Sequence, residues 1–368
     1  MDNDPLHTKL CDMLGIEFPI IAFTHCKDVA AAVVNAGGFS VLGEAMHTPD
    51  EMAADVKWIR ERVGSKPFGI DLVLPASSPL SATLEELEAQ IPETHREFAA
   101  QIKVKYDVPE PKGQQALHQW GGLNQELARA QLDVVLEERV PVFTSGLGNP
   151  AFILDAAHER GIKVFGLIGK ARQAQREIEA GVDCIIAQGY DAAGHTGHIG
   201  TFSIVPEVVA IAGDTPVIAA GGVTTGRHLA AALCLGAAGV WTGTLWLACR
   251  ESDSDMIIKE KLINATAEDT VHGRSVSGMP MRTTKCPWTD EWSKPGAPAT
   301  LGAPYQMLLS SGYIQAANDH RREDLMFEAS GQGVTFVTSM KPARQIVFDI
   351  VDEAHTVFEE LMGSSVPA

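Results

Sequence analysis

Short, almost wholly apolar runs recur along the first two-thirds of the chain, separated by longer segments of mixed polarity. Such continuous runs are typical of parallel strands that are buried on both faces. Eight of them are found, and they cover residues 19–23, 39–43, 68–75, 140–145, 163–168, 184–189, 216–221 and 239–244. Strands that alternate with helical segments predict an α/β fold with a parallel sheet.

The segments between these runs carry helix signals. Thr48 and Pro49 suit an N-cap and a first helical position, and several segments end in glycine, which stops a helix. The predicted helices cover residues 28–38, 48–64, 124–139, 149–161, 170–181 and 224–237. Eight strand–helix units within about 250 residues predict a closed (β/α)8 TIM barrel, here residues 1–250. An open doubly wound sheet is the alternative, but it would carry GxGxxG after its first strand, and "THCKD" contains no glycine.

Two segments do not fit this repeat. Residues 76–120 follow the third strand and hold two short helical patterns and a loop rich in Pro, Lys and Gln. Insertions after barrel strands lie on the face that carries the active site, so a lid is one expectation. A decorative or oligomer-contacting loop is the other. Residues 251–368 are predicted to be a partly helical C-terminal segment that packs back on the barrel mouth.

Composition and charge narrow the class of protein. The formal net charge of −18 opposes binding to nucleic acid or to anionic membranes, which need basic surfaces. No stretch approaches the about 18 apolar residues of a membrane span, and the N-terminus lacks a signal-peptide pattern. The six cysteines form no CxxC pair, which favours free thiols in a reducing compartment. We therefore expect a cytoplasmic protein that acts on a small molecule.

Glycines at the ends of the seventh and eighth strands indicate an anion site. The loops after these two strands are the usual phosphate site of barrel enzymes, because backbone N–H groups and helix N-termini meet there. The candidates are Gly221, Gly222, Gly243 and Thr244. The phosphate could belong to a substrate or to FMN, and tight turns without any ligand are the remaining alternative.

The sixth strand runs into "GYDAAGHTGHIG" (189–200), which is the most unusual stretch of the chain. His195 lies beside glycines at the expected barrel mouth, where an imidazole can act as an acid, a base or a hydrogen-bond donor. His195 and His198 are three residues apart, which could suggest a metal pair. No carboxylate or cysteine stands at matching ligand spacing, so no metal is expected from this pair.

Two longer runs, "AQGYDAAGHTG" (187–197) and "PVIAAGGVTTGRHLAAALCLGAAGVWTGTLW" (216–246), resemble the nitronate monooxygenase family, formerly called 2-nitropropane dioxygenases. The flavin-dependent enoyl-ACP reductases share the pattern. The resemblance extends from residue 19 to about residue 250 and returns in "SGQG" (330–333). It implies an FMN-dependent TIM-barrel oxidoreductase.

Carried over residue by residue, the resemblance implies the following site. His195 lies beside the reactive face of the flavin as the candidate catalytic residue. The implied flavin-lining and phosphate-holding residues are Gln188, Gly189, Ala193, Gly194, Gly221, Gly222, Gly243 and Thr244, with Gly331 and Gln332 approaching from the C-terminal segment.

The chain departs from the family pattern at three strand ends. "AFTH" (22–25) replaces a Gly- or Met-containing stretch and adds His25 at the pocket floor. Asp71 stands where Asn is frequent, and an ionised carboxylate there would disfavour an anionic reduced flavin. "GLIG" (166–169) replaces a stretch that commonly ends in a polar or basic residue. Ala22, Phe23 and Asp71 remain in the predicted flavin-lining set.

The resemblance implies nitronate monooxygenation, in which O2 completes the conversion of an alkyl nitronate to a carbonyl compound and nitrite. The alternative is an NAD(P)H-dependent reductase that acts on an enone, a quinone or an enoyl thioester. A third class, a non-catalytic ligand-binding barrel, would require that the protein bind no flavin. A homodimer is left open.

Overall fold

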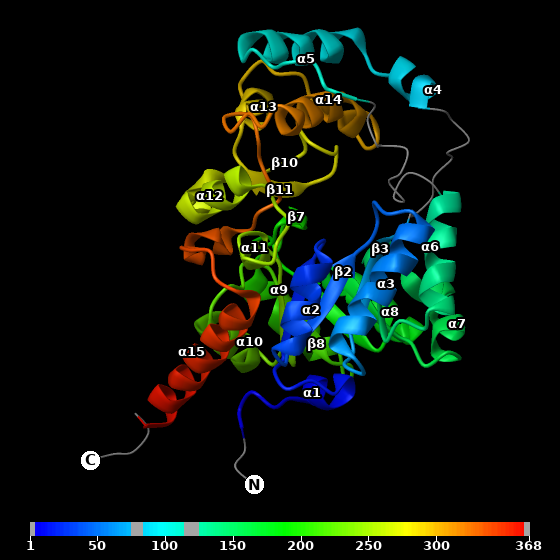
Figure 1. Ribbon diagram of the computed structural model, residues 1–368, viewed down its shortest axis with the longest axis vertical. Helices are drawn as coiled ribbons and strands as arrows, with labels where there is room; N and C mark the ends of the chain where they lie inside the picture. The colour runs from blue at the N-terminus through cyan, green and yellow to red at the C-terminus, as the bar shows by residue number, and fades with distance from the viewer. Residues whose placement is uncertain (1–3, 75–83, 114–124, 364–368) are drawn as a thin grey trace.

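Eight parallel strands close into a barrel in the computed structural model, which describes residues 4–74, 84–113 and 125–363 (Figure 1). Closure is made by β9 pairing with β1, where Ile20 lies opposite Val240. The strands are β1 (Ile20–Thr24), β2 (Phe39–Gly43), β3 (Gly69–Val73), β4 (Val142–Leu147), β5 (Lys163–Ile168), β6 (Cys184–Gln188), β8 (Val217–Ala220) and β9 (Gly239–Thr242). All eight predicted strands and the predicted TIM barrel are confirmed, and the open sheet is excluded.

Helices alternate with these strands and form the outer wall. The best-marked one, α3, begins at a capping box in which Thr48 and Glu51 satisfy each other's backbone N–H groups. The six predicted helices correspond to α2 (Lys27–Asn35), α3 (Pro49–Val63), α6 (Gln125–Glu137), α7 (Leu154–His158), α8 (Ala171–Ala180) and α10 (Gly226–Cys234). A seventh, α9 (Thr201–Ile211), was not predicted, because Pro206 and the preceding glycines weaken its helical pattern.

The apolar core has two layers, because successive strand residues point to opposite faces. Side chains such as Ile21, Phe39 and Phe165 fill the inside of the barrel. The short helix α1 (Lys9–Leu14) closes the bottom of this interior with Leu10. The alternate strand residues pack outward against the surrounding helices. This alternation decides which strand-end residues can face a ligand at the mouth.

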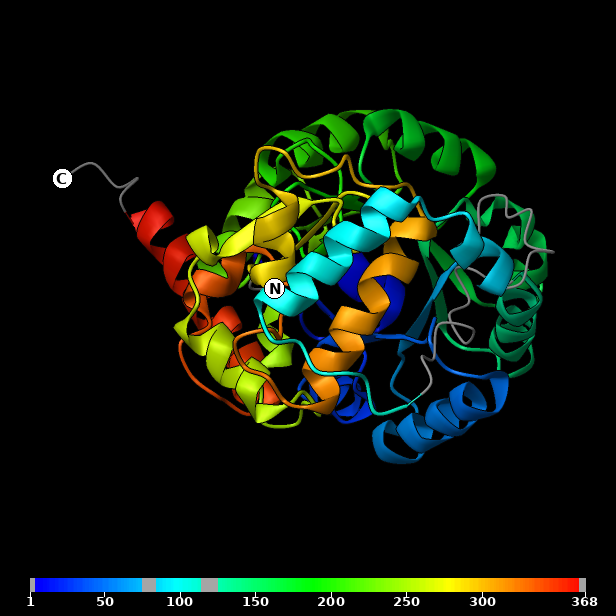
Figure 2. The same ribbon diagram turned by 90° about the horizontal axis from the view of Figure 1, so that it is seen from above.

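The described part of the insertion lies above the barrel and packs on the C-terminal segment. It forms α4 (Leu84–Ala89) and α5 (Glu93–Lys105), which contact α14 (Tyr305–Asp319) and α13 (Pro287–Trp292). Phe98 packs edge-on against Trp292 with ring centroids 4.9 Å apart. Seen from above, α5 and α14 cross over the barrel (Figure 2). Residues 76–83 and 114–120 of the predicted insertion lie outside the described residues.

The C-terminal segment leaves the barrel after α11 (Thr244–Leu247), forms a small sheet and then returns. The sheet has the order β10 (Thr270–Gly273), β11 (Met281–Thr284) and β7 (Gly194–His195), so it includes two residues from the glycine-rich stretch. In the chain, α12 (Met256–Asn264) lies between α11 and β10. The last helix, α15 (Ala343–Gly363), packs against α10 and α2 and thereby completes the outer wall (Figure 1). None of the described helices is long and apolar enough to cross a membrane.

Candidate active site

The mouth of the barrel is lined by the last inward-facing residue of each strand. Phe23 packs against the cluster inside the barrel, whereas Ala22 belongs to the layer between strands and helices. Asp71 and Gln188 share the inward register of their strands. Of the sequence-predicted residues on these strands, Ala22 is therefore the one whose side chain does not face the mouth.

Aromatic rings form one wall of this mouth. Phe23 stacks on Trp241 with centroids 5.5 Å apart, and the ring of His25 meets Phe23 edge-on at 5.1 Å. His25 Nδ1 lies 2.9 Å from the carbonyl oxygen of Gly43, so this nitrogen donates the hydrogen bond. A side chain at residue 43 would collide with the ring of His25. Gly43 therefore makes room for the imidazole that "AFTH" adds.

Asp71 is a buried carboxyl that forms no ion pair with any of the described residues. Its side chain lies against Gly146 at the end of β4, and the backbone N–H of Gly146 is its one described hydrogen-bond donor. Asp71 Oδ1 and the hydroxyl of neighbouring Thr144 have no partner among the described residues. Burial raises the pKa of the Asp71 carboxyl well above its ordinary value, and the Gly146 bond offsets only part of this. Burial therefore disfavours the ionised carboxylate that would oppose an anionic reduced flavin, and it favours the neutral acid.

The opposite wall is built from glycine turns. Gly221 and Gly222 have φ of +105° and +72°, values that favour glycine, and so the chain after β8 turns sharply. Gly189 donates its N–H to the carbonyl of Ala220 at 2.9 Å, which ties the β6 and β8 ends together. The hydroxyl of Thr201 donates to the carbonyl of Gly221 at 2.9 Å. These contacts bring the two glycine-rich stretches of the sequence side by side.

Three helices begin on this wall, and two of their N-termini already hold a carboxylate. The Asp191 side chain accepts from the N–H of Thr201 at the start of α9, at 2.9 Å. Glu353 on α15 accepts from the N–H of Gly226 at the start of α10, at 2.7 Å. By contrast, α11 begins at Gly243 without a side-chain cap. The start of α11 is thus the helix N-terminus on this wall that remains open to an anion.

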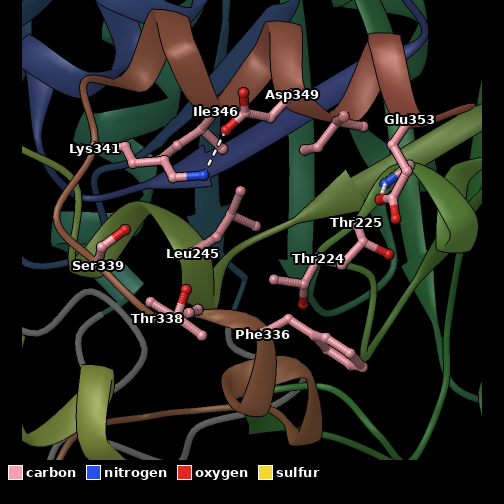
Figure 3. Close-up of a pocket in the computed structure, with 13 residues that line it drawn as sticks. Thr224, Thr225, Leu245, Phe336, Thr338, Ser339, Lys341, Ile346, Asp349 and Glu353 are labelled. Atoms are coloured by element: carbon pink, nitrogen blue, oxygen red, sulfur yellow. Dashed lines mark hydrogen bonds and ion pairs between the residues drawn. The ribbon is translucent and has the colours of Figure 1, made fainter.

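A cavity of about 170 Å³ lies behind the start of α10, between it and α15 (Figure 3). Its floor carries Thr224 and Thr225, and Lys341 pairs with Asp349 at 2.6 Å across one side. Glu353 fills the end nearest the helix terminus. Because Lys341 and the N–H of Gly226 already face carboxylates, neither of these two groups is available to hold an anion here.

The "SGQG" segment closes the same wall from the C-terminal side. Gly331 donates its N–H to the Thr244 hydroxyl at 2.9 Å, and Gln332 donates its N–H to the carbonyl of Asp191 at 2.9 Å. A side chain at Gly331 would press on the backbone of residues 191–193. The structure therefore brings the predicted residues 188–189, 193–194, 221–222, 243–244 and 331–332 together at one end of the barrel.

His195 lies in β7, which pairs with β11 so that His195 is opposite Met281. Its Nε2 is 2.8 Å from the hydroxyl oxygen of Ser277. Burial lowers the pKa of His195 below its ordinary value, so the ring is neutral at neutral pH. Ser277 was not predicted from the sequence, because it lies in the C-terminal segment, outside the repeat of strands and helices that marks the barrel mouth.

His198 has different surroundings from His195. Its ring meets the ring of His272 edge-on at 5.5 Å, and His272 in turn packs on Tyr190 at 4.7 Å. Arg282, which is buried, stacks on Tyr190 at 4.4 Å and donates from Nη2 to its carbonyl oxygen at 3.1 Å. This arrangement fixes the glycine-rich stretch to β11. Arg282 was not found from the sequence, since nothing local distinguishes it from a surface arginine.

Comparisons with known proteins show the family and the fold of this chain. The family model described as nitronate monooxygenase matches residues 7–353. A protein of Mycobacterium tuberculosis named for monooxygenase activity, Rv1533, is 40% identical over 97% of this chain and 99% of its own. A structure of nitroalkane oxidase from Streptomyces ansochromogenes has a TM-score of 0.78 at 26% identity, covering 96% of this chain and 99% of that chain. A structure of FabK from Thermotoga maritima has a TM-score of 0.75 at 28% identity, covering 97% and 99%.

Proposed function

The chain belongs to the nitronate monooxygenase family, and on that premise we propose that it uses FMN to oxidise alkyl nitronates with O2. It is an oxidoreductase of the nitronate monooxygenase type, and this family consists of flavoenzymes. The products are a carbonyl compound and nitrite. The observation that carries the proposal is the joint placement of the glycine wall, the uncapped start of α11 and the neutral imidazole of His195.

The residues present fit FMN on two counts. A Cβ at Gly194 or at Gly243 would meet no atom of the described residues within 4 Å, so these residues leave open space beside both glycines. The mouth also holds two buried polar atoms without described partners, Asp71 Oδ1 and the Thr144 hydroxyl oxygen. Such atoms need a partner to offset their burial, and a polar ring system would supply it.

In this proposal the phosphate lies between the turn at Gly221–Gly222 and the start of α11 at Gly243–Thr244. The backbone at Gln188–Gly189 and Ala193–Gly194 lies along the ring system, with Gln332 closing the wall. One phosphate site and no second nucleotide fingerprint favour FMN over FAD. When bound, FMN supplies the electron transfer from the nitronate, with O2 as the final acceptor.

His195 is the proton-handling group in this proposal. Its lowered pKa leaves a neutral ring that can accept a proton at neutral pH. Because Nε2 faces Ser277, Nδ1 is the nitrogen left to exchange a proton with the substrate. Ser277 fixes the orientation of the ring. A neutral nitroalkane needs this base to form the nitronate, whereas a substrate supplied as the nitronate does not.

The helices above the barrel are proposed to limit access to the mouth. α5 packs on α14 and α13, so the insertion and the C-terminal segment form one layer over the opening (Figure 2). Lys105 and Tyr106 both bond the carboxylate of Glu291, at 2.9 and 2.6 Å, and so tie the two parts together. This layer keeps water away from the reacting atoms and selects substrates by size.

A reductase that takes hydride from NAD(P)H is the second candidate, and the similarity to FabK favours it. Anaerobic reduction separates the two. The purified yellow protein is mixed without oxygen with an alkyl nitronate or with NAD(P)H, and flavin absorbance is followed. Rapid bleaching by the nitronate alone is expected. Bleaching by NAD(P)H alone would favour the reductase, and a colourless protein that takes up no FMN would contradict both.

A further inference from the structure

A second group of ligating side chains lies outside the barrel mouth, behind the end of β2. Glu44 follows β2, His47 lies in the next turn and Asp55 is on α3. One ligand atom from each lies within 4.8 Å of the others. Among the described residues, this is the group of three or more His, Cys, Asp or Glu side chains that lie close enough to hold a metal ion. Glu44 Oε2 is 2.6 Å from His47 Nδ1, which is 3.8 Å from Asp55 Oδ2.

The buried carboxylate of Glu44 has unused binding capacity. Its side chain is completely buried, yet Oε1 has no hydrogen-bond partner among the described residues. An unpartnered carboxylate oxygen in the interior is costly, so it points to a missing partner. The other oxygen of the same carboxylate, Oε2, faces His47, so the side chain as a whole is directed into the cluster.

The surrounding contacts fix the ligands without blocking them. Gln131 on α6 donates from Nε2 to the carbonyl oxygens of Glu44 and His47, at 3.1 and 2.6 Å. Lys27 pairs with Asp55 through Oδ1 at 2.5 Å, which leaves Oδ2 facing His47. Carboxylate ligands of metals are commonly held in this way by an outer hydrogen-bond donor.

We propose that Glu44, His47 and Asp55 bind one divalent transition-metal ion of the Zn²⁺ type. The ion takes the place of the proton on His47 Nδ1, between the two carboxylates. Ligand atoms of a tetrahedral site with bonds of about 2.0–2.1 Å lie roughly 3.3 Å apart, so the two distances from His47 Nδ1, 2.6 and 3.8 Å, need changes of less than about 1 Å. One imidazole and two carboxylates favour Zn²⁺ over Mg²⁺, which prefers oxygen ligands alone. Because His47 is partly exposed, water completes the coordination.

The ion would hold the β2–α3 turn against α3. Glu44 also donates its backbone N–H to the carbonyl of Asp71 at 3.0 Å, so this turn is fastened to the strand that carries the mouth carboxyl. The site is structural, and it stands independently of the flavin and of the nitronate reaction.

The test is calorimetric titration of tag-free, metal-free, flavin-loaded protein with Zn²⁺, Mn²⁺ and Mg²⁺. We expect one equivalent of Zn²⁺, weaker Mn²⁺ binding, no Mg²⁺ binding at the same concentrations, and a rise in Tm with Zn²⁺. His47→Ala and Asp55→Asn should each weaken Zn²⁺ binding about 100-fold or more.

Two control variants make the result specific. His158→Ala removes the histidine of an exposed pair with Asp183, and it should leave Zn²⁺ binding unchanged. Lys27→Met removes the cation at Asp55 but no ligand, and this variant should still bind one equivalent of Zn²⁺. The absence of saturable Zn²⁺ binding, or equal Zn²⁺ affinity in His47→Ala and the unmodified protein, would overturn the proposal.

Discussion

The two walls of the barrel mouth are made of different groups. The wall formed by the ends of β6, β8 and β9 presents backbone amides from glycine turns, whose positions the chain itself fixes. The wall formed by β1 to β4 presents side chains, and the charge of one of them, the buried Asp71, changes with protonation. A fixed anion suits the first wall. The second wall can be altered by a single substitution or by pH, so it is where members of one family can differ in chemistry.

The strongest test of the glycine wall is Gly222→Asp. A carboxylate there would lie against the proposed phosphate and close to Asp191, whose Cβ is 3.1 Å from the position of the new Cβ. Repulsion between like charges at close range should weaken FMN binding at least about 100-fold. The measurement is the flavin content after gel filtration and the Kd for added FMN.

Two variants separate charge from strain at this position. Gly222→Ala meets the same φ of +72° without a charge, so it should lose stability but keep more flavin than Gly222→Asp. Gly302→Asp places the same carboxylate at an exposed glycine with open space, and it should bind FMN normally. Normal flavin content in Gly222→Asp would show that the phosphate lies elsewhere.

The next largest effect is expected at His195, which joins the glycine wall to the C-terminal sheet. His195→Asn should keep the fold and the flavin, and it should lower kcat/KM by roughly 10²–10⁴ on a neutral nitroalkane. The loss should be smaller on a substrate supplied as the nitronate, because its proton has already left. In the unmodified protein, the acidic limb of kcat/KM should lie below pH of about 6.5, since burial lowers the pKa of the base.

His198→Asn is the matched control for this variant. His198 packs on His272 rather than on Ser277, so its replacement should affect turnover much less. Near-normal activity in His195→Asn on both substrates would show that His195 takes no part in the reaction. The glycine-rich stretch would then only pack against the flavin.

A buried carboxyl outside the mouth provides a reference for Asp71. Glu177 on α8 lies against Gly166 of β5, in the space that a side chain at residue 166 would fill. Burial raises its pKa from 4.5 to about 7, so the folded protein keeps a proton that the unfolded chain releases between these values. The free energy of unfolding therefore falls as pH rises through this window, by roughly 2–3 kcal/mol between about pH 5 and about pH 8.5.

Glu177→Gln should remove that fall, which urea unfolding at both pH values would measure against the unmodified protein. Glu179→Gln, an exposed position on the same helix, should leave the fall in place. An equal pH dependence in Glu177→Gln would show that Glu177 is hydrated in the folded state.

The sequence was most informative where structure is local. Eight apolar runs predicted the barrel, because a parallel strand that is buried on both faces is a continuous apolar run, which can be recognised without knowing which strands it pairs with. The glycine turns could also be predicted, because glycine is the residue that most readily adopts the positive φ that such turns need. Ser277 and Arg282 could not be predicted, since each acts on residues about 80 to 90 positions away through a sheet that the pattern did not reveal. The packing of α15 on α10 and α2 could not be predicted for the same reason, and neither could the raised pKa of Asp71, which depends on burial by other strands.

The smallest effect, and the sharpest test of the side-chain wall, is expected for Asp71→Asn. Burial raises the pKa of Asp71 and so favours the neutral acid, and an amide of the same shape is likewise uncharged and also donates a hydrogen bond. FMN affinity at neutral pH should therefore change by less than about tenfold, or about 1.4 kcal/mol. The difference should grow as pH rises: ionisation of Asp71 would leave an unpaired buried carboxylate, so the unmodified protein should lose stability and flavin while Asp71→Asn should not. Flavin fluorescence and urea unfolding across the alkaline range measure both, with the exposed Asp214→Asn as control. If Asp71→Asn instead released its flavin at neutral pH, the carboxylate itself would be the form in use, and the side-chain wall would carry a fixed negative charge.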